Sequence, residues 1–360
     1  YPLIDGVQKG CPHHILEPAR TNVITYSEDF SNSSWSKGNS SITSDSIISP
    51  DGSLNADKLT ADSSNSTHYI DTSSISFTSG VSYTVSIFVK NNNKNLVIQG
   101  SGSVTANAFA SFDLKNGVVI NESVGTGIIK NFGNDWWRCS LTFTSAATTS
   151  GVITFLMGET RNDSYQGDGT SGLYIYGASL EAGSFPTSYI PTTSTTVTRS
   201  AETATGAGNS TTFNDSEGVL MAEISGFVDA DDYRIISLNA GNSADNIFLG
   251  LRNDTGNVYI YIPGAGASFV SDVNATNTFV KVALKYKTDD VSVYINGFKL
   301  YVDTTVTLPT GLNQLEFGYG NGNPGSYPFY GKTKQVQYFD SILADTQLEQ
   351  LTSWQSFRDM

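Results

Sequence analysis

Short runs in which apolar and polar residues alternate are the feature that most limits the folds open to this chain. Two of the clearest are SYTVSIFVK at residues 82–90 and WWRCSLTFTS at residues 136–145. Alternation places every second side chain on one face of an extended strand, as a half-buried β-strand requires. No window of helical length here shows a 3.6-residue period, and turn-forming residues separate the runs. About eight to ten such strands predict an antiparallel sandwich or jelly roll.

A second set of alternating runs follows residue 214 and predicts a second antiparallel sandwich. Its clearest signal is VSVYINGFKLYV (residues 291–302), where Asn296-Gly297 separates two strands. Asn-Gly tolerates the positive φ angles that both central residues of a type I′ hairpin turn need. The sequence therefore predicts a tight hairpin at this point.

One short helix is predicted near the end of the chain, at residues 344–357. Leu348 and Leu351 recur there at helical spacing, and Thr346 with Glu349 resembles a capping box. The predicted fold class is therefore all-β, with two antiparallel sandwiches and one short C-terminal helix.

The chain length of 360 residues also favours two domains. Residues 193–213 are rich in Thr, Ala, Gly and Ser and carry no apolar period, so they form the best linker. We expect an extended N-terminal arm at residues 1–22, a first sandwich at 23–192 and a second at 214–360. The chain starts on Tyr1 rather than Met, and we expect it to be a fragment of a longer polypeptide.

Composition excludes several classes of partner. Charged residues make up 15% of the chain, hydrophobic residues 38%, and the formal net charge is −14. No Lys/Arg cluster is present to neutralise phosphates, so we expect no nucleic-acid binding, and the acidity disfavours anionic membranes. No apolar run approaches the roughly 18 residues of a membrane span, and no signal peptide is apparent. The acidity suits solubility or the binding of a divalent cation.

The chain has two cysteines, Cys11 and Cys139. One disulfide would join the N-terminal arm to a strand far along the chain. Two unpaired thiols are the alternative, because a disulfide-stapled secreted domain usually carries more cysteines.

The first half contains a set of motifs that occur together. They are the run LEPARTN (Leu16 to Asn22), Trp35, the run ISPDGSLNADKLT (residues 48–60) and the WWR strand at residues 136–138. The later runs YQGDGTSGLYIYGASLEAGSFPTSYIPT and TRSAE belong to the same set. On these motifs, the first half resembles a module common in bacteriophage tail, spike and head-fibre proteins. This module is similar to jelly-roll carbohydrate-binding modules. In the arm, Glu17 and Arg20 are expected to fix the register by charge-assisted bonds.

The second half contains the runs EGVLMAEI, KVALKYKTDDVSVYINGFK and FYGKTKQVQYFDSILADTQLEQLTS. In these runs it resembles laminin-G or concanavalin-like sandwiches. Together the two resemblances cover residues from about 11 to 356. They imply a module of a virion surface that attaches to a host cell-surface polysaccharide and joins other virion proteins through an upstream region. A homotrimer is expected if the parent protein is a fibre or spike.

Sugar binding needs an exposed aromatic face beside amide, carboxylate or guanidinium groups that bond to hydroxyls. Trp136 and Arg138 share one strand face, opposite the core-facing Trp137, and would supply a platform and a clamp. The alternative is that Trp136 packs under a loop. Tyr69 and Tyr165 are further candidates.

The second half also contains a Gly/Asn/aromatic loop at residues 318–331. Tyr319, Tyr327 and Tyr330 could present ring faces to a sugar there. Exposed loop aromatics without a ligand are the alternative.

Calcium is the metal that we expect, because it prefers oxygen ligands in a carboxylate-rich protein. The resemblance implies acids near the first strand, which Glu28 and Asp29 supply, and an acid in the last strand, where this chain has Gly177 instead. Asp168 is a substitute. In the second sandwich, the candidate ligands are three loop acids: Asp231, Asp232 and Asp245.

The sequence gives little support to catalysis. His13 and His14 are adjacent, but no second His or Cys pair stands at metal-ligand spacing. No Gly-x-Ser-x-Gly or phosphate-binding loop occurs, and no Glu begins the Glu-x-Asp-x-x-Glu pattern of concanavalin-like glycosidases. We therefore expect a non-enzymatic protein. A glycosidase or polysaccharide lyase, a purely structural virion decoration protein, and a secreted or bacterial cell-surface adhesin are the alternatives.

Overall fold

The computed structural model describes residues 3–4, 7–8, 13–228, 232–242, 244–262, 267–318 and 327–354. These residues form two compact units. The first unit contains the described residues of 19–200 with the N-terminal strands β1 (Leu3–Ile4) and β2 (Val7–Gln8), and the second contains those of 201–360 with β3 (His14–Leu16). The predicted all-β fold, with two antiparallel sandwiches and one short C-terminal helix, is confirmed.

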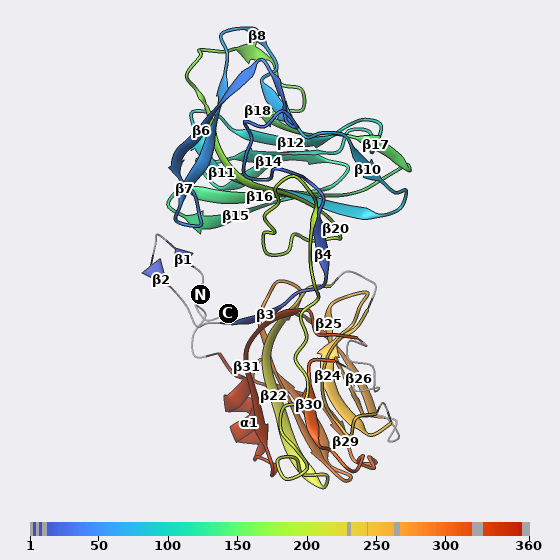
Figure 1. Cartoon of the computed structure of the whole chain (residues 1–360). Coiled ribbons are helices and arrows are strands. Elements are labelled where there is room, and N and C mark those ends of the chain that lie inside the picture. Colours follow the sequence, from blue (N-terminus) through green and yellow to red (C-terminus); the bar gives the residue numbers. More distant parts are fainter. Residues whose placement is uncertain are drawn as a thin grey trace. The chain divides into compact units, whose positions relative to one another are not determined.

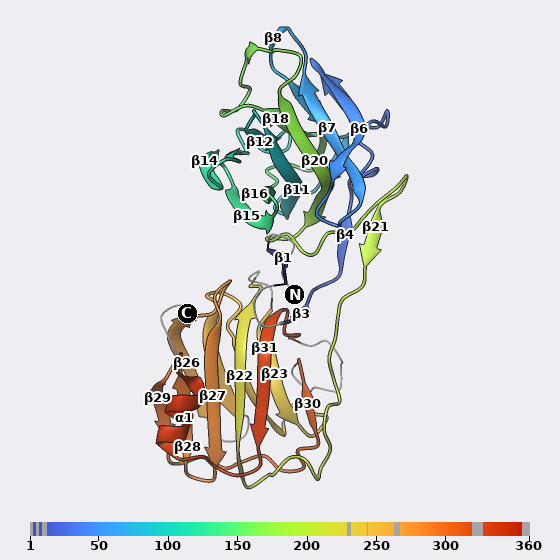
Figure 2. The same ribbon diagram turned by 90° about the vertical axis from the view of Figure 1, so that its left-hand side faces the viewer.

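The first sandwich is built from two six-stranded antiparallel sheets (Figures 1 and 2). One sheet has the order β15-β16-β11-β20-β7-β6 and the other β14-β13-β12-β18-β9-β5. The strands of the first sheet are β6 (Ser40–Ile48), β7 (Leu54–Ala61), β11 (Ser82–Asn92), β15 (Thr126–Gly133), β16 (Trp136–Thr144) and β20 (Gly172–Ala182). The strands of the second are β5 (Ser36–Gly38), β9 (Tyr69–Asp71), β12 (Leu96–Gly100), β13 (Phe109–Asp113), β14 (Val118–Ser123) and β18 (Ile153–Met157).

Alternation along β11 and β16 builds the core between these two sheets. Every second residue of β11 from Tyr83 to Val89 is buried in one cluster, as the sequence predicted. Cys139 of β16 joins the same cluster as a free thiol, and its complete burial raises the pKa of that thiol. Cys11 lies outside the described residues.

Four short strand pairs also belong to the described part of the first unit. They are β10 (Ile75–Phe77) with β17 (Thr149–Gly151), β8 (Asn65–Ser66) with β19 (Tyr165–Gln166), β4 (Arg20–Asn22) with β21 (Val197–Arg199), and β1 with β2. The pair β8–β19 matters for the site described below, because it holds the backbone of Tyr165.

The second sandwich also consists of two sheets, with the orders β29-β28-β27-β22-β31-β3 and β26-β25-β24-β23-β30 (Figure 2). The first comprises β3 with β22 (Glu217–Gly226), β27 (Val280–Lys287), β28 (Val291–Ile295), β29 (Phe298–Asp303) and β31 (Gly331–Phe339). The second comprises β23 (Arg234–Asn239), β24 (Asn246–Leu251), β25 (Asn257–Ile262), β26 (Ala267–Asn274) and β30 (Gln314–Glu316). One apolar cluster fills the space between them.

The predicted hairpin and helix are both present in the second sandwich. Asn296 and Gly297 have φ angles of 51° and 90° between β28 and β29, as a type I′ turn requires. Helix α1 (Asp345–Thr352) packs on β27, β28 and β29 through the buried Leu348. The predicted capping box at Thr346 is wrong by two residues: the N-cap is Ala344, whose N–H donates to the side chain of Gln347.

The residues of the predicted arm and linker are divided between the two units. His14–Leu16 forms an edge strand beside β31 of the second sandwich, whereas Arg20–Asn22 pairs with β21 of the first. The backbone N–H of Glu202 donates to the Glu17 carbonyl within the second unit. Glu17 and Arg20 were expected to fix the register of the arm by charge-assisted bonds. The N–H of Glu17 also donates to the carboxylate of Glu202, at 2.9 Å, whereas the guanidinium of Arg20 lies over the ring of Phe185, 5.3 Å from the centroid.

No helix among the described residues has the length and apolar character needed to cross a membrane.

Candidate functional site

A polar pocket of about 590 Å³ opens at one end of the first sandwich. Three connections meet there: the turn between β11 and β12, the turn between β13 and β14, and the loop that leads from β18 to β19. Its lining residues are Asn91, Asn93, Lys94, Asn95, Asp113, Lys115, Gly158, Glu159, Asp163 and Tyr165. Because strand ends are fixed by the sandwich, a rigid scaffold positions these side chains.

The side chain of Asn91 fixes the β11–β12 turn by hydrogen bonds to its backbone. The side-chain oxygen of Asn91 accepts the N–H of Asn93 at 2.9 Å, and its amide nitrogen donates to the Lys94 carbonyl at 2.8 Å. Asn93 adopts a φ of 67°, a left-handed conformation that Asn tolerates better than most residues. The turn therefore presents the exposed side chain of Asn93 at the pocket rim.

Asn95 ties the three connections together. Its side-chain oxygen accepts the N–H of Leu114 in the β13–β14 turn at 3.1 Å. Its amide nitrogen donates to Oε1 of Glu159 at 3.3 Å, and the N–H of Glu159 donates to Asp163 at 2.9 Å. A connected network of amide and carboxylate groups thus joins the three connections.

The carboxylate of Asp113 forms hydrogen bonds within its own turn. Both its oxygens accept hydrogen bonds, from the Asn116 side chain and from the N–H groups of Lys115 and Asn116. The Asn116 side-chain bond is the largest cause that lowers the pKa of Asp113. Of the charged lining groups, Lys115 and Glu159 remain exposed at the rim.

Tyr165 is the aromatic residue of the pocket and was predicted as a sugar-contact residue. The ammonium of Lys94 lies 3.5 Å from its ring centroid, and the imidazole of His68 lies 4.6 Å from it, centroid to centroid. Its hydroxyl is buried and finds no hydrogen-bond partner among the described residues. Burial, followed by the charges of Asp163 and Asp168, raises the pKa of this hydroxyl.

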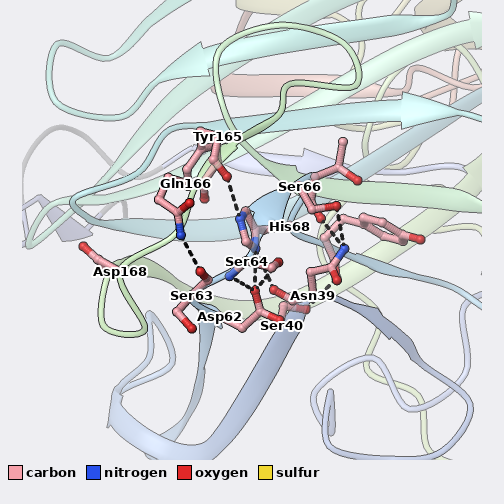
Figure 3. A network of polar contacts seen from close by, with 12 residues as sticks. Asn39, Ser40, Asp62, Ser63, Ser64, Ser66, His68, Tyr165, Gln166 and Asp168 are labelled. Carbon is pink, nitrogen blue, oxygen red and sulfur yellow. Dashed lines mark hydrogen bonds and ion pairs between the residues drawn. The ribbon is translucent and has the colours of Figure 1, made fainter.

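A network of polar contacts holds the backbone of Tyr165 in place (Figure 3). The ring of His68 lies between the carbonyl oxygens of Asn39 and Tyr165, at 2.6 and 3.2 Å. The N–H of Gly167 donates to the Ser64 carbonyl at 2.9 Å, and the side chain of Gln166 donates to the Ser63 carbonyl.

Trp136 lies in a second pocket, of about 760 Å³, on the outer face of the sheet that contains β16. The expected open ring platform is wrong, because only 3% of Trp136 is exposed. It packs under the β6–β7 connection, and its indole N–H donates to the Ile48 carbonyl at 3.3 Å. Arg138 shares this strand face but bonds to the Ser86 hydroxyl at 2.9 Å and lies over the ring of Phe88.

None of the other predicted sugar-contact residues that the structure describes lines either pocket. Tyr69 lies flat on Gly38, where an added Cβ would come 2.2 Å from the tyrosine ring. In the second sandwich, Tyr327 is 37% exposed and packs edge-on against Tyr233, 5.7 Å away. Tyr330 receives the guanidinium of Arg234 over its ring. Tyr319 lies outside the described residues.

Two of the predicted calcium ligands lie on different networks. Oε1 of Glu28 is 3.1 Å from the hydroxyl of Tyr176, which also lies 2.8 Å from Oδ2 of Asp51. Asp29 instead accepts bonds from Ser31 and Asn32 within its own turn. The hydroxyl of Tyr176 therefore connects Glu28 to Asp51, whereas the described side-chain bonds of Asp29 stay within its own turn.

The remaining predicted ligands are loop acids. Asp168 accepts bonds from the N–H of Thr170 and from the N–H and hydroxyl of Ser171; the Ser171 hydroxyl is the largest cause that lowers its pKa. Asp245 bonds to Asn242, and Asp232 is exposed. Asp231 lies outside the described residues. Nowhere in the described part of the chain do three or more His, Cys, Asp or Glu residues form a group suited to a metal, so calcium stays a prediction.

The pocket residues other than Tyr165 were missed from the sequence. The signal was available in the run KNNNKN at residues 90–95, where amides and lysines separate two alternating strands. Asparagines are common in turns, so such a run by itself predicts no more than a turn. The pocket becomes apparent only in the structure, where three connections meet.

Comparison with known proteins places one family in the second sandwich. Residues 223–349 match a laminin-G family described as the concanavalin A-like lectin/glucanases superfamily. The predicted concanavalin-like domain is thereby confirmed. No curated protein matches the chain.

Solved structures give distant likenesses. The CBM40 domain of a Ruminococcus gnavus IT-sialidase, bound to α2,3-sialyllactose, is 18% identical, covers 42% of this chain and 94% of its own, and has a TM-score of 0.34. A leech intramolecular trans-sialidase complexed with 2,7-anhydro-Neu5Ac is 19% identical over 40% of this chain and 24% of its own, with a TM-score of 0.33. Domains LG4-5 of the mouse laminin α1 chain are 10% identical. The match covers 76% of this chain and 86% of the laminin chain, with a TM-score of 0.27.

Proposed function

We propose that this chain is a non-enzymatic carbohydrate-binding module of a virion surface, and that the pocket at Tyr165 binds a host cell-surface polysaccharide. The phage-like motifs from Leu16 to Asn22 and the concanavalin-like match of the second sandwich support this function. The observation that carries the proposal is the pocket itself, where one tyrosine lies among amides, carboxylates and ammonium groups.

The lining of the pocket suits the hydroxyls of a sugar. Asn93 supplies an amide that can donate and accept, Glu159 accepts, and Lys115 donates. The buried hydroxyl of Tyr165 has no partner among the described residues, and a ligand hydroxyl or bound water would supply one.

The balance of charge favours a neutral glycan over an acidic one. Two ammonium groups, of Lys94 and Lys115, stand against three carboxylates, of Asp113, Glu159 and Asp163. A polyanionic ligand would meet these carboxylates in a chain whose net charge is −14, which adds repulsion at low ionic strength.

Single-site sugar affinity is expected to be weak, and many copies on one particle would raise the overall avidity. The proposal therefore includes partners that hold several copies together, namely other virion proteins and, in a fibre or spike, a homotrimer. A secreted or bacterial cell-surface location remains the alternative setting for the same binding chemistry.

Affinity electrophoresis through gels that contain neutral or acidic polysaccharides tests the proposal. We expect retardation in at least one neutral gel, and we expect Tyr165→Ala to restore free mobility. Tyr174→Ala is the matched control, because Tyr174 is a partly buried tyrosine that lines the pocket at Trp136 instead.

The outcomes separate the alternatives. Retardation that Tyr174→Ala abolishes and Tyr165→Ala does not would move the site to the pocket at Trp136. Uniform mobility in every gel would overturn sugar binding and favour a structural decoration protein. A steady release of reducing ends from any polysaccharide would favour the glycosidase or lyase.

A further inference from the structure

His68 is a buried imidazole with a hydrogen-bond acceptor at each ring nitrogen. Its side chain has no exposed surface, and it stands just before β9. Nδ1 lies 2.6 Å from the Asn39 carbonyl oxygen, and Nε2 lies 3.2 Å from the Tyr165 carbonyl oxygen (Figure 3). Both contacts have hydrogen-bond length.

A backbone carbonyl oxygen only accepts hydrogen bonds, so both ring nitrogens must donate for both contacts to form. Neutral imidazole has one N–H and one lone pair, whereas imidazolium has two N–H groups. A neutral ring would direct a lone pair at one carbonyl oxygen and leave a buried acceptor without its donor. The geometry therefore fits the positively charged ring.

Charged groups of both signs lie near this ring. Oδ1 of Asp62 lies 3.5 Å from Nδ1, and the charge of the imidazole contributes, after the bonds from Ser64, to the lowered pKa of Asp62. Beyond the ring of Tyr165 stand the charged groups of Lys94, Asp163 and Asp168, the last two close enough to act on the tyrosine hydroxyl.

His68 connects the core of the sandwich to the pocket. Its own carbonyl accepts the N–H of Met157 in β18, so the backbone at His68 is fixed by the sheet. Its ring contacts both the carbonyl and the ring of Tyr165. The side chain of His68 thus links the Tyr165 backbone to β18, in addition to the pairing of β19 with β8.

We infer that His68 is a positioning residue whose doubly protonated ring holds Tyr165 in its ligand-binding place, so that glycan affinity falls as the ring loses its proton. This inference rests on the proposed function for its ligand. Its structural part, the coupling of Tyr165 to the charge of His68, does not need a glycan.

The first experiment follows the free protein by NMR between pH 5 and 8. The ¹⁵N shifts of the His68 ring should show two N–H groups at the acid end, and the ring resonances of Tyr165 should titrate with the same midpoint. In His68→Gln, which donates from one amide only and carries no charge, the Tyr165 resonances should not titrate with that midpoint.

The second experiment repeats the affinity gels at pH 5.5 and pH 8 with a retarding neutral polysaccharide. Wild type should bind roughly ten-fold more weakly at pH 8, the scale expected for one lost charge-assisted bond. His68→Gln should bind weakly at both values, and a thermal melt should show that it remains folded. His14→Gln, at an exposed histidine of β3, should keep the wild-type profile.

The results separate this inference from the proposed function. A ring that is neutral at pH 5, or Tyr165 resonances that ignore its titration, would overturn the inference whether or not a glycan binds. Coupled titration together with uniform gel mobility would confirm the positioning role and overturn the glycan ligand. Strong binding that does not change with pH would overturn the inference and leave the proposed function standing.

Discussion

The ammonium nitrogen of Lys37 lies 2.7 Å from the carbonyl oxygen of Asn32, inside the loop that leads into β5. The carbonyl oxygens of Ser31 and Trp35 lie 3.0 and 2.9 Å from the same nitrogen. Burial lowers the pKa of Lys37, and the carboxylates of Asp29 and Asp57 act in the opposite direction. A protein cation thus fills a cage of backbone oxygens of the kind that a metal ion would also select.

Replacing Lys37 should destabilise the first sandwich. Lys37→Met keeps the alkyl stem but leaves the three carbonyl oxygens without their common donor, at a cost of about 2 kcal/mol in the free energy of unfolding. Denaturant unfolding at pH 7 measures this cost. Lys115→Met, at an exposed position, is the control and should change the free energy of unfolding little. An equal loss in both variants would show that the three carbonyl contacts of Lys37 do not stabilise the fold.

Calcium, if it binds, should bind at Glu28 rather than at Lys37. The hydroxyl of Tyr176 contacts both Glu28 and Asp51, but it has only one proton to donate. One of the two carboxylates therefore faces an oxygen lone pair, and a bound cation would offset the repulsion between them. Calcium should raise Tm by a few degrees. Glu28→Gln should remove this rise, and Asp29→Asn should keep it, because Asp29 bonds within its own turn. A wild-type Tm that is the same in calcium and in chelator would contradict the prediction.

The sequence predicted the fold well because periodicity and turn chemistry are local. Alternation in β11 and the Asn296-Gly297 turn both appear in the structure as expected. Site residues were harder, because exposure is set by distant segments. The alternation in β16 places Trp136 on the outer face of the sheet, yet the β6–β7 connection covers it. The role of Tyr165 depends on turns that lie up to about 70 residues away along the chain.

Asp57 should make the stability of the first sandwich depend on pH. Burial raises its pKa from 3.8 to about 6, although the N–H groups of Phe30 and Asp45 donate to its carboxylate and oppose the shift. Between these two values the folded state holds a proton that the unfolded state has released. The contribution of Asp57 to the free energy of unfolding is therefore fully present below pH 3.8 and falls by up to ~3 kcal/mol as pH rises to about 6.

Asp57→Asn isolates this contribution from those of other groups. The variant should be less stable than wild type at pH 4, because its amide nitrogen cannot accept one of the two backbone N–H groups. The difference in unfolding free energy between variant and wild type should shrink from pH 4 to pH 7. A constant difference over that range would show that Asp57 titrates as an ordinary carboxylate.

Gly167 is the residue whose replacement should disturb Tyr165 most directly without touching the pocket lining. A Cβ at this position would lie 1.8 Å from the carbonyl oxygen of Asp62 and 3.0 Å from Cε1 of His68. A backbone oxygen gives way only if the chain moves, so Gly167→Ala should separate β19 from the Asp62 loop. We expect the ring resonances of Tyr165 to shift and glycan retardation to fall at least several-fold, with a stability loss of about 1–3 kcal/mol.

Gly102→Ala, where nothing lies within 4 Å of the added Cβ, should leave all three measurements unchanged. Full retardation of Gly167→Ala, with Tyr165 shifted, would show that ligand binding does not depend on where the loop places the tyrosine.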